Sequence, residues 1–77
     1  MKRAFLATVV DVERKHSDSF VVRLECDALT KGSELISTGL NGEQSHERGE
    51  SSVKVICQRN PKAEVGDKVP VIIDLPK

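Results

Sequence analysis

Four side chains of types that bind transition metals occur in the sequence: His16, Cys26, His46 and Cys57. Structural zinc sites are usually built from cysteines or histidines in close pairs along the chain, because that spacing pre-arranges a tetrahedral ligand set. None of the four residues has a second such ligand at that spacing. We therefore expect neither a bound metal nor another cofactor.

Ser45, His46 and Glu47 are the residue types of a nucleophile, a base and an acid, and they are consecutive in the chain. Nucleophilic catalysis requires the base to lie within hydrogen-bond reach of the nucleophile. Side chains of adjacent residues point in different directions in regular structure, and no pair of carboxylates suggests acid and base catalysis. The sequence predicts that the protein is not an enzyme.

The composition describes a small chain with balanced charge. Its 77 residues suffice for one core, so we expect a single domain, residues 1–77. Twelve basic and twelve acidic residues give no overall field that attracts polyanions, although a local basic face would still bind nucleic acid.

The location predicted from the sequence is cytoplasmic. The apolar run at residues 4–10 is too short for a membrane span or a signal peptide. Cys26 and Cys57 lie in apolar alternating stretches, where a reduced thiol behaves as a small buried hydrophobe. We expect a soluble protein without membrane contact.

Three segments alternate apolar and polar residues with the period of a half-buried strand: residues 20–27, 53–58 and 68–75. The side chains expected to face the core are Phe20, Val22, Leu24, Cys26, Val53, Val55, Cys57, Val69, Val71, Ile73 and Leu75. Pro70 lacks an amide proton, which predicts a sheet edge or a bulge there. Gly66 is expected to take a positive φ in the preceding turn.

The first strand is predicted at residues 4–13, which are apolar on both faces. Such a strand is either central in the sheet or bulged, so that its inward face changes along its length. The polar connector at residues 14–18 is too short for a parallel crossover, so the first two strands should form an antiparallel hairpin.

The middle of the chain gives weaker signals. Residues 31–37 read as a strand bracketed by glycines, with a single helical turn as the alternative. Residues 38–52 are almost entirely polar, which predicts a long mobile loop. Asn41 and Gly42 are a hairpin signal, so a flexible hairpin arm is the alternative there.

Five short strands without a helix predict an all-β fold, a small antiparallel barrel of the oligonucleotide-binding-like or SH3-like kind. A small β-sandwich is the alternative. Either architecture is typical of a binding module.

Nucleic acid is the first candidate ligand. Barrels that bind single strands combine a basic groove with aromatic side chains on which bases stack. Arg23, Lys54 and Arg59 fall in outward positions of the predicted strands, and Phe5 is the available aromatic residue. These four residues form the predicted nucleic-acid site.

A protein partner, including a second copy of the chain in a homodimer, is the other candidate. Val21, Ile56 and Ile72 also fall in outward positions. If their strands are neighbours, the three side chains form an exposed apolar stripe, which is typical of an interface. An unpaired sheet edge would serve the same purpose.

Overall fold

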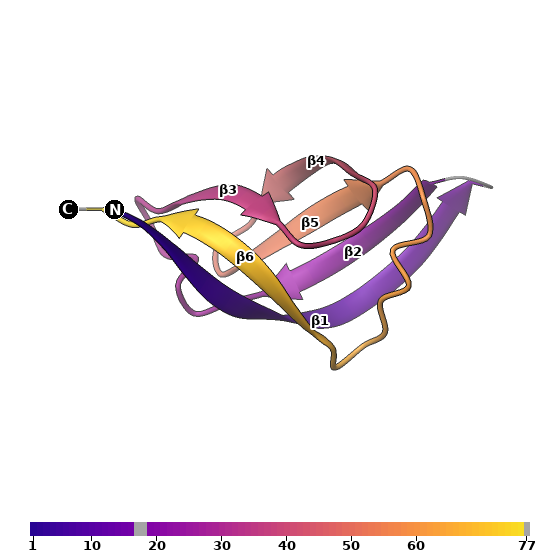
Figure 1. Cartoon of the computed structure of the whole chain (residues 1–77), viewed down its shortest axis with the longest axis horizontal. Helices are drawn as coiled ribbons and strands as arrows, with labels where there is room; N and C mark the ends of the chain where they lie inside the picture. Colours follow the sequence, from indigo (N-terminus) through magenta and orange to yellow (C-terminus); the bar gives the residue numbers. More distant parts are fainter. Residues whose placement is uncertain (17–18, 77) are drawn as a thin grey trace.

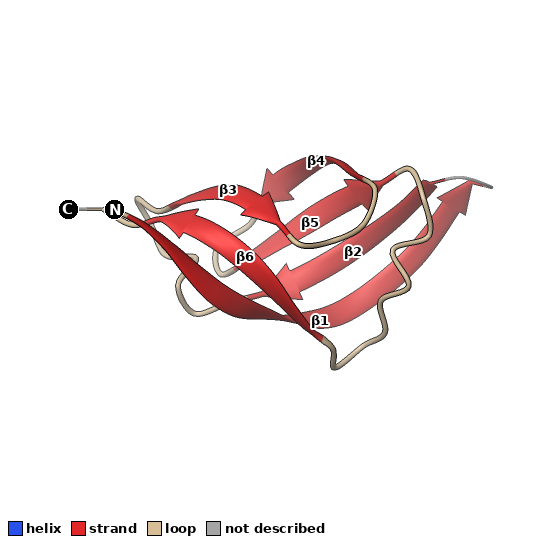
Figure 2. Ribbon diagram, in the orientation of Figure 1, coloured by secondary structure: helices blue, strands red, loops and turns tan. Residues whose placement is uncertain are grey.

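The computed structural model describes residues 1–16 and 19–76, and they form one sheet of six antiparallel strands. The strands are β1 (Lys2–His16), β2 (Ser19–Glu25), β3 (Glu34–Thr38), β4 (Glu43–Arg48), β5 (Ser52–Cys57) and β6 (Lys68–Asp74). Their spatial order is β3-β6-β1-β2-β5-β4 (Figures 1 and 2). The described residues include no helix of the length and apolar character needed to cross a membrane.

The sheet curls into a nearly closed barrel because its two edge strands, β3 and β4, are consecutive in the chain (Figure 1). Only residues 39–42 join them, so the edges must lie close together. The Thr38 hydroxyl donates a hydrogen bond to the carboxylate of Glu43 across this gap, which we call the seam. The predicted small β-barrel is confirmed, with six strands rather than five.

The core consists of the predicted inward side chains of β2, β5 and β6. Those that are buried are Val22, Leu24, Val53, Val55, Cys57, Val69, Val71 and Ile73. Phe20, Cys26 and Leu75 lie at the periphery of this core and are partly buried. Leu29, Leu35 and Leu40 add to it from the connections and from β3.

A bulge in β1 explains why its sequence is apolar on both faces. Val9 pairs with Leu24, and the next pair is Asp11 with Arg23, so Val10 is the extra residue. Before the bulge Ala7 and Val9 are buried; after it Val12 packs against the core. The inward register changes at Val10, which confirms the bulged form of the prediction.

The prediction of a loop at residues 38–52 is wrong for its central part. Residues Glu43–Arg48 form β4, which pairs with β5. The side chains of this strand are all polar, so it has no hydrophobic face to bury. Its backbone ladder to β5 stabilises it instead. Asn41 and Gly42 do form a turn, with Gly42 at φ +78°, but the turn connects opposite edges of the sheet and not a hairpin.

Two further predictions concern β6 and the turn before it. Gly66 takes a φ of +99°, as expected. Strand β6 is not an edge strand, because it lies between β3 and β1. Pro70 nevertheless costs no ladder bond to β3, since the β3 pairing ends at Thr38 and Val71. The carbonyl of Pro70 accepts a hydrogen bond from the Gly39 amide at 2.8 Å.

Candidate binding site

Arg23 and Lys54 are direct partners on the neighbouring strands β2 and β5. Both side chains are exposed on the outer face of the barrel. Their Cβ atoms are therefore about 5 Å apart, the usual separation of opposed residues in an antiparallel pair. The structure brings these two predicted residues together, and we refer to them as the cation pair.

The cation pair lies in the middle of a row of charges that crosses four strands. Asp11 on β1 is opposite Arg23, and Glu47 on β4 is opposite Lys54. Within residues 1–16 and 19–76, neither cation forms an ion pair within 4 Å or a side-chain hydrogen bond. Like charges directly opposite each other repel, whereas the opposite charges of Asp11 and Glu47 on the flanking strands offset part of this repulsion. An anion lying over the pair would reduce the remaining repulsion.

A hollow of about 370 Å³ adjoins the cation pair. Its lining residues are Arg23, Glu47, Arg48, Gly49, Ser52 and Lys54. Three cationic side chains therefore face one carboxylate. Although the whole chain has a formal net charge of zero, this hollow, near the β4–β5 turn, has more cationic than anionic side chains.

A second hollow, of about 290 Å³, lies on the same outer face toward the β1–β2 hairpin. Val21 and Ile56 form its apolar part; they are direct partners on β2 and β5, and both are half-buried. It shares Arg23, Glu47 and Lys54 with the first hollow and adds Asp11, Glu13 and Lys15, so its three cations meet three carboxylates. Glu13 and Lys15 form an ion pair at 2.5 Å. The hydrogen bond and charge of Lys15 lower the pKa of Glu13.

Arg59 and Phe5 lie apart from the cation pair. Arg59 follows the far end of β5, next to Gly42. Phe5 is on β1 opposite Val71, half-buried against the core. Neither residue lines the hollow that holds Arg23 and Lys54.

Ile72 is also separated from its predicted companions Val21 and Ile56. It pairs with Ala4 near the start of β1, whereas Val21 pairs with Glu13 near the end of that strand. Leu6, which pairs with Pro70, is diagonal to Ile72 across β1 and β6, and Ile36 lies in the β3 bulge beside Ser37, the partner of Ile72. Leu6 and Ile36 are 65% and 40% accessible. We call Leu6, Ile36 and Ile72 the apolar patch. Their grouping depends on the order of the strands, which the alternation of residues does not indicate.

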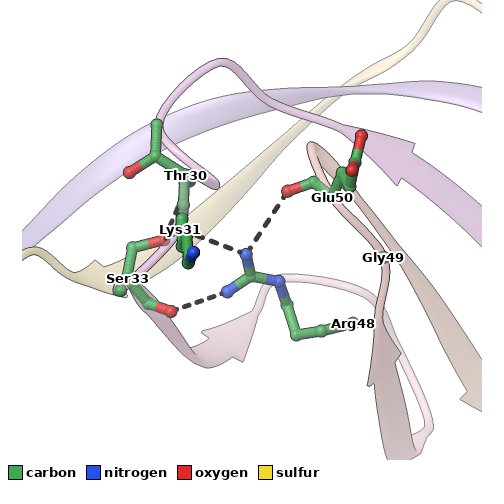
Figure 3. A pocket seen from close by; sticks show the side chains of 7 residues that line it. Thr30, Lys31, Ser33, Arg48, Gly49 and Glu50 are labelled. Atoms are coloured by element: carbon green, nitrogen blue, oxygen red, sulfur yellow. Dashed lines mark hydrogen bonds between the residues drawn. The ribbon is translucent and has the colours of Figure 1, made fainter.

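A larger hollow of about 520 Å³ lies at the seam and was not predicted. It is lined by Thr30, Lys31, Gly32, Ser33, Arg48, Gly49 and Glu50, and we call it the seam pocket. Figure 3 shows Thr30, Lys31 and Ser33 on one side, Gly49 and Glu50 on the other, and the Arg48 guanidinium between them. The sequence does not indicate this site, because residues 31–37 are predicted as a strand and residues 38–52 as a polar loop, and nothing in the sequence places the two segments side by side.

The metal-binding and catalytic residue types stay dispersed. Among the described residues, no group of three histidine, cysteine or acidic side chains is placed to hold a metal ion; the side chain of His16 lies outside that description. His46 is half-buried on β4, while Ser45 and Glu47 are exposed. Burial, and secondarily the charge of Glu43, raises the pKa of the Cys57 thiol.

Comparison with known proteins adds no assignment. No protein-family model matches the chain, and searches of curated proteins and of solved structures give no significant match.

Proposed function

We propose that this chain is a non-enzymatic binding module whose ligand is single-stranded nucleic acid, bound along the outer faces of β2 and β5. The observation that supports this most directly is the cation pair. Two like charges lie on opposed residues and repel each other, and no carboxylate of the described chain forms an ion pair with either of them within 4 Å, although Asp11 and Glu47 are opposite them on the flanking strands. A phosphate lying over Arg23 and Lys54 would remove their repulsion.

The surroundings of the cation pair favour a single strand over a duplex. Val21 and Ile56 place a half-buried apolar surface beside the two cations, and a duplex, whose bases are stacked inside, would leave it uncovered. Exposed bases of a single strand can cover such a surface while the phosphates contact Arg23 and Lys54. No aromatic side chain lines either hollow. The binding is therefore mainly electrostatic, without sequence preference, and strongly weakened by salt.

The test is a titration of a fluorescently labelled single-stranded oligonucleotide with the protein, at low and at moderate salt. We expect binding at protein concentrations of about 100 μM or below at low salt, weakening as salt rises. In the double variant Arg23→Gln/Lys54→Gln, the plot of log association constant against log salt concentration should become less steep by about 1.4. Each phosphate contact to a single strand contributes about 0.7 to the steepness of this plot.

The control removes one charge at the opposite end of the barrel. Lys62 is exposed in the connection before β6 and has a φ of 54°, which asparagine tolerates, so Lys62→Asn is a suitable variant. Its titration should match that of the wild type. Absence of binding by the wild-type protein at about 100 μM and low salt would overturn the proposal.

Self-association is a second candidate function, supported by the apolar patch. Leu6 is 65% accessible and Ile36 is 40% accessible, although both belong to strands. A second copy of the chain would cover this face. Sedimentation should then show a species heavier than the 8.5 kDa monomer, and Leu6→Ser should restore the monomer.

Val65→Ser is the matched control for this second candidate, because Val65 is 67% accessible but lies outside the patch, in the connection before β6. It should leave the sedimentation unchanged. A strictly monomeric wild-type protein would exclude this function and leave the nucleic-acid proposal unaffected.

A further inference from the structure

The seam pocket lies between two segments far apart in the sequence, residues 30–33 before β3 and residues 48–50 after β4 (Figure 3). Arg48 connects them. Its guanidinium donates hydrogen bonds to the carbonyls of Ser33 at 2.9 Å, Thr30 at 3.4 Å and Glu50 at 3.5 Å. All three acceptors are neutral, so they hold the guanidinium in position without cancelling its charge.

Lys31 adds a second positive charge to the pocket. In the described part of the chain, its ammonium group has neither an ion-pair partner nor a hydrogen bond. The backbone amides of Lys31 and Gly32 likewise donate no hydrogen bond to any described residue. The residues that line this concavity therefore include two cations and two amides without a described acceptor, beside the single carboxylate of Glu50. Cations and unpaired amides are the groups that bind anions.

The seam pocket is continuous with the hollow at the cation pair. Arg48 and Gly49 line both. Position 49 has no side chain to separate them, and a Cβ there would meet the hydroxyl oxygen of Ser52 at 2.8 Å. Across the two hollows, four cations, Arg23, Lys31, Arg48 and Lys54, accompany two carboxylates, Glu47 and Glu50.

We propose that the bound nucleic-acid strand continues from the cation pair across Gly49 into the seam pocket, where Lys31 and Arg48 hold a further phosphate. This inference rests on the proposed function and extends its site from the outer face of β2 and β5 to the seam. The same geometry assigns Glu50 an opposing effect. Its carboxylate forms no ion pair among the described residues, so its charge repels the incoming phosphate.

The experiment uses two single variants of opposite charge change in the oligonucleotide titration described above. Lys31→Gln should weaken binding at low salt by about 3- to 10-fold and lower the salt slope by about 0.7. Glu50→Gln should strengthen binding at low salt. Both side chains are exposed and form no hydrogen bond or ion pair with a described residue, so thermal unfolding should be unchanged.

Lys62→Asn is the control for loss of one positive charge at a distant position. If Arg23→Gln/Lys54→Gln weakens binding but Lys31→Gln behaves as Lys62→Asn does, the strand does not enter the seam pocket, and the proposed function stands. If Glu50→Gln leaves affinity unchanged as well, the electrostatic role of the pocket is excluded. If the wild-type protein does not bind the oligonucleotide, both proposals fail.

Discussion

At the scale of single residues, the two cysteines differ in environment. Cys57 is fully buried, and burial is the main cause of its raised pKa, whereas Cys26 is half-buried at the end of β2. The thiolate is the reactive form. We therefore expect a thiol-reactive disulfide reagent to label Cys26 in the folded protein and to label Cys57 only after unfolding.

The Cys26→Ser variant isolates Cys57 for this measurement, and its labelling rate can be compared in buffer and in denaturant. Because the pKa of the Cys57 thiol is raised in the folded state, the folded protein retains this proton at a pH where the thiol of the unfolded chain ionises. This contribution to stability is complete below about pH 8.5 and is lost as the pH rises further. Equal labelling rates in buffer and in denaturant would contradict the buried position of Cys57.

Two glycines with positive φ differ in what surrounds them. Gly66 has φ +99° and open space where a Cβ would lie, whereas Gly42 has φ +78° and a Cβ there would be 3.0 Å from the Cβ of Arg59. Gly66→Ala should cost about 1–2 kcal/mol from backbone strain alone. Gly42→Ala should cost more, because the steric conflict with Arg59 adds to the same strain. Equal losses in chemical denaturation would mean that the Arg59 segment moves aside freely.

The sequence predicts which side chains of a strand point outward, but it does not predict which outward side chains are neighbours on the barrel. The alternation of β2 and β5 placed Arg23 and Lys54 outward, and both are exposed. That they are direct partners depends on β2 and β5 being neighbours, and this pairing joins segments separated by two other strands in the sequence. For the same reason Ile72 was grouped with Val21 and Ile56, although it pairs with Ala4 at the other end of β1.

At the scale of elements, the sequence predicts strands through their buried faces. Residues 53–58 and 68–75 alternate because one face of each strand is in the core, and the structure confirms both. Strand β4 has no such face: Glu43 and His46 are half-buried, and the other side chains are exposed. Its backbone pairing with β5 stabilises it, and this pairing leaves no hydrophobic pattern in the sequence.

Arg48 is the side chain that joins the two edges at this end of the barrel. Its hydrogen bond to the Ser33 carbonyl has an ordinary length of 2.9 Å, whereas those to the carbonyls of Thr30 and Glu50 are longer and weaker. A hydrogen bond from a charged donor contributes about 1.5–3 kcal/mol. We expect Arg48→Ala to lose about 1.5 kcal/mol in chemical denaturation, the lower end of this range, because Arg48 is exposed.

Hydrogen exchange locates the effect of this substitution. Amides of β3 should exchange faster in Arg48→Ala, while those of β2 and β5, which pair in the interior of the sheet, should change little. Arg48→Lys keeps the charge but loses the forked donor geometry, so it should lie between Arg48→Ala and the wild type. Uniform acceleration in all strands would show that the seam opens only with global unfolding.

At the scale of the whole molecule, a formal net charge of zero gives no indication of a binding face. The hollow near the β1–β2 hairpin has three cations and three carboxylates, whereas the hollow near the β4–β5 turn has three cations and one carboxylate. The two hollows share Arg23, Glu47 and Lys54, so they differ only in the further charges: Arg48 at one end, and Asp11, Glu13 and Lys15 at the other. The positive excess therefore arises from strand pairing, which composition does not record.

The stability of the whole barrel depends on a single small core, made mainly of valine, leucine and isoleucine. A domain below about 80 residues rarely has more than about 3–5 kcal/mol of net stability, and replacing a buried leucine by alanine costs about 2–5 kcal/mol. Leu24 is fully buried in the central part of the sheet, so Leu24→Ala should leave the chain largely unfolded at 25 °C. Leu6→Ala removes the same atoms from a 65% accessible side chain and should cost less than about 0.5 kcal/mol.

Circular dichroism and chemical denaturation of the two leucine variants measure this difference. Because five of the strands contribute to the single core and β4 depends on its ladder to β5, Leu24→Ala should lose the signals of all six strands together rather than those of β2 alone. A Leu24→Ala variant that stays folded with a cooperative transition would require a stability well above that of ordinary domains of this size. Self-association through the apolar patch would supply such stability, and it would make the transition midpoint depend on protein concentration.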